Sequence, residues 1–128
     1  MKLLLDTHLL LWAGEDSPRL PALASSLISN SENELLFSVA SIWEISIKHA
    51  KGLETFHARP GAVWEGLLEN GYAELAVLGK HAVAAGNLPP IYKDPFDRLL
   101  IAQAMVEGIT LLTADAVIAR YPGPIRKI

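Results

Sequence analysis

The chain has 128 residues, a formal net charge of −3 and no cysteine, and 51% of its residues are apolar. This length suits one domain, and we expect a single domain spanning residues 1–128. The absence of cysteine excludes disulfides and thiolate metal sites, and the acidic balance argues against binding long nucleic acid through basic residues alone. No apolar run approaches the ~18 residues that a membrane span needs, so we expect a cytoplasmic protein without membrane contact.

Short apolar runs alternate with segments of helical periodicity in the first part of the chain. In chain order we expect a strand at 2–6, helices at 7–14 and 20–29, a strand at 34–39, helices at 40–51 and 62–69, and a strand at 72–78. Gly52 supplies a stop signal for the helix at 40–51. Thr7 and Asp6 are both candidate caps of the first helix.

The remaining part of the chain continues the alternation and contains the clearest helix. We expect helices at 80–85, 95–107 and 114–120 and strands at 109–112 and 125–128. Asp94 stands directly before Pro95 and is the expected N-cap of the long helix, which Gly108 closes. Short buried strands that alternate with helices predict a three-layer α/β/α sandwich with a mostly parallel central sheet.

Four acidic residues lie near the places where the expected strands end. Asp6 closes the first strand, Glu44 lies one turn into the helix after the second, and Asp115 follows the strand at 109–112. Asp97 lies in the first turn of the long helix. Ligands of open parallel sheets bind beyond the carboxyl ends of the strands. We therefore expect these carboxylates to meet at one edge of the sheet.

Carboxylates held a few ångströms apart stay ionised only when a cation neutralises them. Oxygen ligands without thiolates or paired histidines select Mg²⁺ or Mn²⁺ rather than zinc. The histidines His8, His49, His57 and His81 show no zinc spacing, and we assign them no metal role. A hard cation in such a pocket can activate water for displacement at phosphorus, which makes an acidic pocket compatible with a polyanionic substrate.

Each acid also has a local interpretation without catalysis. Asp6 and Asp115 can cap the helices that follow them, and Glu44 can pair with Lys48 at i+4. Asp97 can interact favourably with the dipole of its helix. The long helix is apolar on most sides, however, and a buried acid needs a partner, which favours a functional role for Asp97. The convergence of all four residues carries the hypothesis, because none of them is decisive alone.

Four motifs carry a resemblance to a known family. They are LDTH at 5–8, SVASIWEI at 38–45, DPFDRLLIAQA at 94–104 and LTAD at 112–115, and they span nearly the whole chain. In this order the motifs resemble the PIN-domain ribonucleases, in particular the toxin component of VapBC-type toxin–antitoxin modules. The second and third motifs together are specific, whereas the first and last are weak signals alone.

The resemblance implies that Asp6, Glu44, Asp97 and Asp115 form a catalytic metal-binding quartet for Mg²⁺ or Mn²⁺. It implies supporting hydroxyl groups at Thr113 and Ser41. It further implies a toxin that hydrolyses RNA, forms a homodimer and is inhibited by a cognate antitoxin. Asp94 remains a helix cap in our interpretation. Tyr92 stands where this subgroup often has histidine, so its role is left open.

Two basic residues near the expected pocket, Arg98 and Lys48, are candidate substrate contacts. A catalytically silent PIN-like module that binds RNA or protein is the main alternative, although all four acids are present. A phosphatase that forms an aspartyl-phosphate needs an aspartate two residues after its nucleophile, where this chain has His8, and the paired acids of a receiver domain are not evident. We expect a metal-dependent endoribonuclease.

Overall fold

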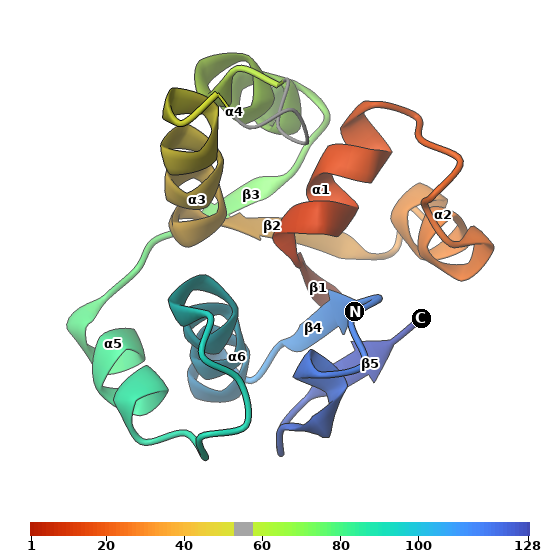
Figure 1. The fold of residues 1–128 in the computed structure, drawn as a ribbon. Helices are drawn as coiled ribbons and strands as arrows, with labels where there is room; N and C mark the ends of the chain where they lie inside the picture. The colour runs from red at the N-terminus through yellow and green to blue at the C-terminus, as the bar shows by residue number, and fades with distance from the viewer. Residues whose placement is uncertain (53–57) are drawn as a thin grey trace.

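The apolar runs of the chain form a parallel five-stranded sheet at the centre of the fold (Figure 1). A computed structural model describes residues 1–52 and 58–128, and the statements below concern those residues; His57 lies outside them. The strands are β1 (Lys2–Leu5), β2 (Glu34–Ser38), β3 (Ala73–Leu75), β4 (Thr110–Thr113) and β5 (Ile125–Lys127). They lie in the order β3-β2-β1-β4-β5, and each neighbouring pair is parallel.

Burial on both faces explains why the central strands are continuously apolar. Leu3, Leu4 and Leu5 of β1 are all fully buried, yet successive side chains of a strand point to opposite faces. Leu3 and Leu5 belong to the core under α1 and α2, whereas Leu4 belongs to the core under α6. Each face of the sheet therefore needs its own layer of helices.

The helices supply these two layers and confirm the expected α/β/α sandwich. They are α1 (Thr7–Gly14), α2 (Ala22–Ser29), α3 (Val39–Ala50), α4 (Pro60–Glu69), α5 (Gly79–Gly86), α6 (Pro95–Glu107) and a short 3-10 turn, η1 (Ile118–Arg120). Residues of α1, α2 and α4 pack on one face, and residues of α5, α6 and η1 pack on the other. Within the described residues, no helix is both long and apolar enough to cross a membrane.

Two expected elements are shorter than the sequence indicates. β3 covers only Ala73–Leu75 of the strand expected at 72–78, because it is an edge strand that pairs with β2 over three residues. Beyond it, the Ala76 carbonyl accepts a hydrogen bond from the Gln103 side chain instead of a strand neighbour. The helix expected at 114–120 is reduced to η1, since the Asp115 carboxylate holds the preceding turn by accepting from the Val117 amide.

The strand order changes direction between β1 and β4, at whose carboxyl ends two loops leave the sheet. From β1 the chain continues to β2 and β3 on one side, whereas β4 and β5 lie on the other side. A reversal of this kind leaves the loops after the two central strands free to diverge, and ligands of α/β sheets bind there. Asp6 directly follows β1, and Asp115 lies two residues after the end of β4.

Candidate active site

Asp6 is a buried carboxylate at the junction of β1 and α1, with 4% of its surface exposed. Its Oδ1 accepts a hydrogen bond from the Leu9 amide at 2.9 Å, so Asp6 rather than Thr7 is the N-cap of α1. Its Oδ2 accepts from the Thr113 hydroxyl at 2.5 Å. The capping interpretation of Asp6 is therefore correct, but it accounts for only one of the two carboxylate oxygens.

Thr113 connects Asp6 to Asp115 across the two central strands. The Thr113 side chain is fully buried at the end of β4, and its hydroxyl accepts a hydrogen bond from the Asp115 amide at 3.0 Å while it donates to Asp6. The Asp115 carboxylate accepts from the Val117 amide at 2.8 Å through Oδ1. The Thr113 hydroxyl, for which the resemblance implied a supporting role, thus orients the Asp6 carboxylate and the backbone of Asp115.

Glu44 approaches the same edge of the sheet from α3. It is 2% exposed, so it does not lie on the solvated helix face that a simple i+4 pair with Lys48 suggests. The pair does form, with Lys48 Nζ 2.7 Å from Glu44 Oε2. Thr7 Oγ1 lies 2.7 Å from Glu44 Oε1 and 2.9 Å from Ser41 Oγ, so two hydroxyls of α1 and α3 accompany the carboxylate.

The first turn of α6 contributes two acids with different roles. Asp94 is the N-cap expected from the sequence, and its Oδ1 accepts from the amides of Phe96 at 2.9 Å and Asp97 at 3.2 Å. Asp97 lies on the first turn itself and is partly buried. Asp97 therefore projects from a fixed helix start, and Asp94 adds a second negative charge beside it.

Acids from several elements of the fold act electrostatically on Asp97 and so belong to one group. Burial raises the pKa of Asp97, and the charges of neighbouring acids raise it further, to about 8. In decreasing order of effect these acids are Asp94, Glu44, Asp6 and Asp115. Burial also raises the pKa of Asp6, against the opposing effects of the Thr113 and Leu9 hydrogen bonds. We call Asp6, Glu44, Asp97 and Asp115 the acid group.

A divalent cation fits the chemistry of the acid group. The group offers only carboxylate oxygens, the ligands that Mg²⁺ and Mn²⁺ prefer, and its mutual repulsion is the kind that a bound cation relieves. Among the described residues, no three aspartate, glutamate or histidine side chains are arranged as they stand so that they could hold a metal ion. Several carboxylate oxygens are instead held by protein donors such as Thr113 and Lys48. Metal binding would therefore exchange some of these internal bonds.

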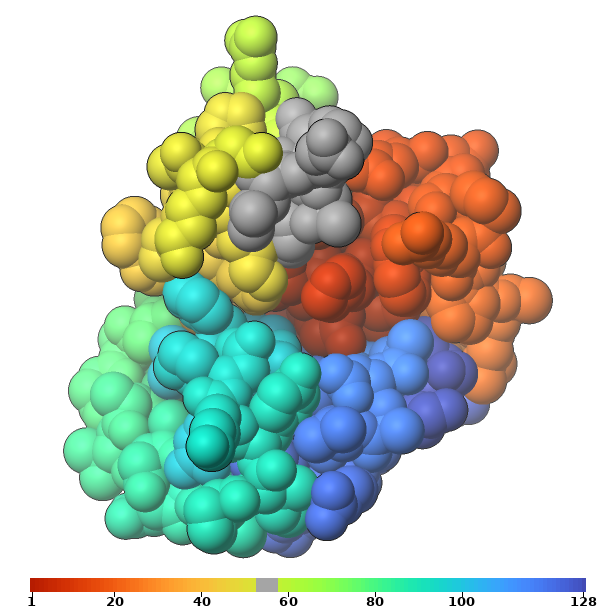
Figure 2. All heavy atoms as spheres, in the orientation of Figure 1, coloured from red at the N-terminus to blue at the C-terminus, as the bar shows by residue number. Residues whose placement is uncertain are grey.

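The surface above this edge of the sheet is hollowed. Figure 2 shows the red N-terminal segment recessed between the cyan segment that leads into α6 and the blue segment after β4.

Arg98 has a role different from the one expected from the sequence. Its guanidinium makes five hydrogen bonds, which go to the carbonyls of Ala85, Leu88, Pro89 and Tyr92 and to the Tyr121 hydroxyl. The structure thus directs this guanidinium into the loop between α5 and α6, not towards a substrate. Lys48 lies at the acid group, where it contacts Glu44.

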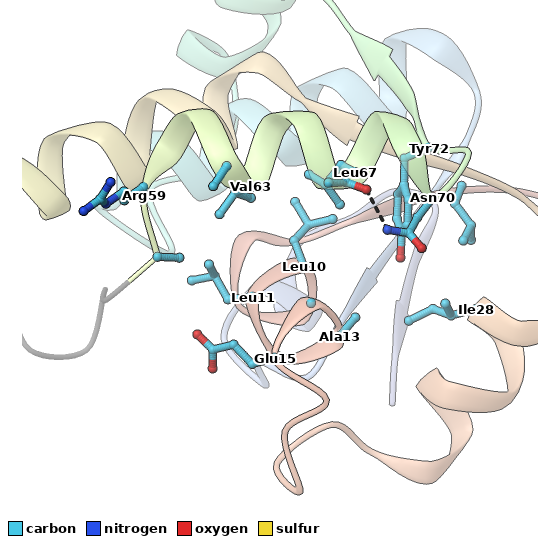
Figure 3. A pocket seen from close by; sticks show the side chains of 15 residues that line it. Leu10, Leu11, Ala13, Glu15, Ile28, Arg59, Val63, Leu67, Asn70 and Tyr72 are labelled. Carbon is cyan, nitrogen blue, oxygen red and sulfur yellow. Dashed lines mark hydrogen bonds between the residues drawn. The ribbon is translucent and has the colours of Figure 1, made fainter.

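An apolar hollow lies away from the acids. Figure 3 shows this cavity of about 590 Å³ between α1, α2 and α4, with Leu10, Ile28, Val63 and Leu67 among its lining residues. It contains no member of the acid group. Trp43 on α3 is 61% exposed, which leaves a contact surface on this helix.

Sequence reasoning missed two contributors to the region of the acid group, Thr7 and Tyr121, and did not foresee the contacts of Tyr92. Thr7 was assigned to helix capping, although its hydroxyl serves Glu44. Tyr92 and Tyr121 interact through backbone and hydroxyl groups 29 residues apart in the chain, and no local pattern reports such a contact. For Thr7, its position directly after Asp6 at a strand end was a usable signal.

Comparisons with known proteins agree with this geometry. A chain of VapBC2 from Rickettsia felis, solved bound to a DNA fragment from their promoter, superposes with a TM-score of 0.71 at 18% identity and covers 100% of this chain and 99% of that chain. A chain of DNA-bound VapBC from Salmonella typhimurium gives a TM-score of 0.69 at 20% identity, with coverage of 99% and 98%. These structures share the fold, whereas no curated protein matches the sequence. The family model for the PIN domain matches residues 3–124, so the chain belongs to the PIN domain family.

Proposed function

We propose that this protein is a divalent-metal-dependent endoribonuclease and the toxin of a type II toxin–antitoxin pair. The observation that carries the proposal is the acid group itself, whose charges act on Asp97 from three other elements of the fold. The position of the group, at the carboxyl ends of the two central strands, is where parallel sheets bind ligands. Membership of the PIN domain family supports nuclease chemistry at this position.

Asp6, Asp97 and Asp115 are the residues that would hold Mg²⁺ or Mn²⁺, with Glu44 completing the site. Such an ion supplies Lewis-acid stabilisation of a phosphodiester and a water of lowered pKa. The protein's own contribution is orientation: Thr113 fixes Asp6, while Thr7 and Lys48 fix Glu44. In-line attack by water would leave a 5′-phosphate and a 3′-hydroxyl. Lys48, next to Glu44, remains a candidate contact for the substrate phosphate.

The proposed toxin role includes a cognate antitoxin, a homodimer and a cytoplasmic location. The VapBC complexes that share this fold support the antitoxin. Trp43, which is 61% exposed, lines one surface hollow together with Val39 and Ile42, and this apolar surface supports a protein partner. Size measurement by light scattering tests the homodimer.

The test is incubation of the purified protein with structured and single-stranded RNA in Mg²⁺, Mn²⁺ or EDTA, with the ends of the products mapped. We expect cleavage only with a divalent ion, and a loss of about 100-fold or more in Asp6→Asn. Glu69→Gln is the matched control, because it removes an exposed acid from the end of α4. Metal-independent cleavage, or full activity of Asp6→Asn, would contradict the mechanism.

A catalytically silent module that binds RNA or protein is the second candidate. The internal hydrogen bonds that hold Asp6 and Glu44 favour it, because these carboxylates are already partnered without an ion. Tight binding of RNA in Mg²⁺ with no cleavage over hours would support this candidate against the nuclease.

A further inference from the structure

Tyr92 is held by its backbone in the loop between α5 and α6. Its amide donates to the Tyr121 hydroxyl at 2.6 Å, and its carbonyl accepts from that hydroxyl at 3.2 Å and from Arg98 Nη1 at 3.4 Å. Tyr121 is 4% exposed, and Arg98 Nη1 also donates to its hydroxyl at 3.2 Å. One buried hydroxyl therefore secures both peptide groups of Tyr92.

The rest of the loop is equally restrained. Arg98 Nη2 donates to the carbonyls of Ala85 at 2.9 Å and Leu88 at 3.2 Å, and Nη1 donates to Pro89 at 3.0 Å. Since Arg98 lies one residue after Asp97 on α6, the loop is attached to the same helix turn that presents this acid. The position of Tyr92 relative to the acid group is thus built into the fold.

The side chain of Tyr92 takes no part in this backbone network. Its ring packs partly against the core under α6 and remains partly exposed. Burial raises the pKa of the Tyr92 hydroxyl, and four acids raise it further: Asp97, Asp115, Asp94 and Glu44. The ring consequently has one part packed against the core under α6 and another part accessible, in the loop that leads to the helix of Asp97.

An acidic pocket has little attraction for an RNA strand beyond what a bound cation provides, and the whole chain carries a net charge of −3. Aromatic rings offer an uncharged alternative, because bases of single-stranded RNA stack on them regardless of charge. We propose that Tyr92 is a substrate-positioning residue: Tyr121 and Arg98 hold its backbone next to the helix turn of Asp97, and its ring stacks on a base next to the scissile phosphate. This inference rests on the proposed nuclease function.

The test compares Tyr92→Phe and Tyr92→Ala with the wild type in cleavage of a short single-stranded RNA in Mg²⁺. Both variants keep the backbone bonds to Tyr121 and Arg98, so both should fold, and their thermal unfolding verifies this. We expect Tyr92→Ala to raise KM roughly 5- to 150-fold with kcat within about threefold of wild type. Tyr92→Phe should retain KM within about twofold. Trp64→Ala is the control, since Trp64 is 40% exposed on α4 and bonds to Glu74.

An unchanged KM in Tyr92→Ala would overturn the inference while leaving the nuclease proposal intact. Equal losses of kcat in both variants would also overturn it, because the hydroxyl rather than the ring would then act. If the wild type cleaves nothing, the nuclease proposal fails, and stacking is tested separately with RNA that contains 2-aminopurine. Quenching of its fluorescence by wild type and Tyr92→Phe, but not by Tyr92→Ala, is expected; equal quenching by all three would contradict the inference.

Discussion

Two polar networks meet at the first turn of α6, and they balance charge in opposite ways. The guanidinium of Arg98 is surrounded by neutral acceptors, four backbone carbonyls and the Tyr121 hydroxyl. The acid group next to it combines several carboxylates with the amine of Lys48, and burial together with the repulsion between the acids raises the pKa of Asp97 to about 8. The Arg98 network gives a positive charge its hydrogen-bond acceptors, whereas the acid group brings several negative charges together.

This difference separates a structural network from a functional one. Carbonyls around a partly buried cation compensate for its desolvation and connect distant parts of the loop, so the Arg98 network stabilises the fold. Carboxylates gathered in a partly buried crevice destabilise it unless protons or a cation neutralise them. Removing a charge should therefore have opposite effects in the two networks.

The largest effect on stability is expected from Arg98→Met. This change keeps most of the aliphatic stem but removes the five hydrogen bonds that the guanidinium donates. The Ala85 carbonyl keeps the Leu88 amide as a donor, whereas the carbonyl of the buried Leu88 loses its guanidinium donor, and an acceptor left unpaired is costly. We expect the free energy of unfolding in urea to fall by about 2–4 kcal/mol. The control is Arg120→Met at an exposed position. A loss no greater than that of the control would show that the network contributes little.

The distinction between the networks also marks the limit of inference from the sequence. The helix at 95–107 was predicted to the residue, because its signals are local: Asp94 caps it, Pro95 opens it, and Gly108 closes it at a φ of 67°. The edge of the sheet where the acids gather followed from the alternation of strands and helices and the rule for parallel sheets.

Side-chain contacts between distant segments had no such local signal. In the sequence, Arg98 is a basic residue beside an acid. Only the fold shows that its guanidinium donates to carbonyls of the preceding loop. Trp43 has the spacing of a buried helix face, yet nothing in the described residues covers it. The assignment of the acid group as a metal site stays a prediction.

Neutralising the charge of Asp97 should change the free energy of unfolding less than Arg98→Met does, and it should raise it. The unfolded chain releases this proton near the ordinary value of 3.8, whereas the folded state keeps it to about pH 8, so folding binds a proton in this interval. The stability that this proton contributes is complete below pH 4 and is lost as the pH rises through 8. In EDTA we expect the free energy of unfolding to be higher at pH 5 than at pH 8 by on the order of 1–3 kcal/mol.

Asp97→Asn tests the cause of this pH dependence. Its amide stays neutral, so its unfolding free energy should vary less between pH 5 and pH 8 and should exceed that of the wild type at pH 8. Glu69→Gln, which alters an exposed acid of α4, should behave as the wild type does. A pH profile of Asp97→Asn parallel to that of the wild type would assign the dependence to other groups.

The smallest effect is expected from Mg²⁺, and it should involve only the acid group. A cation that binds the folded state alone stabilises it, by about 1.4 kcal/mol at a concentration ten times its Kd. Because Asp97 holds a proton below about pH 8, the gain on adding Mg²⁺ should be larger at pH 8.5 than at pH 6. Thermal unfolding with Mg²⁺ and with an equal ionic strength of Na⁺ separates binding from screening. Asp97→Asn should lose most of this gain, whereas Arg98→Met, although less stable, should keep it, because its altered network offers no ligand to the ion.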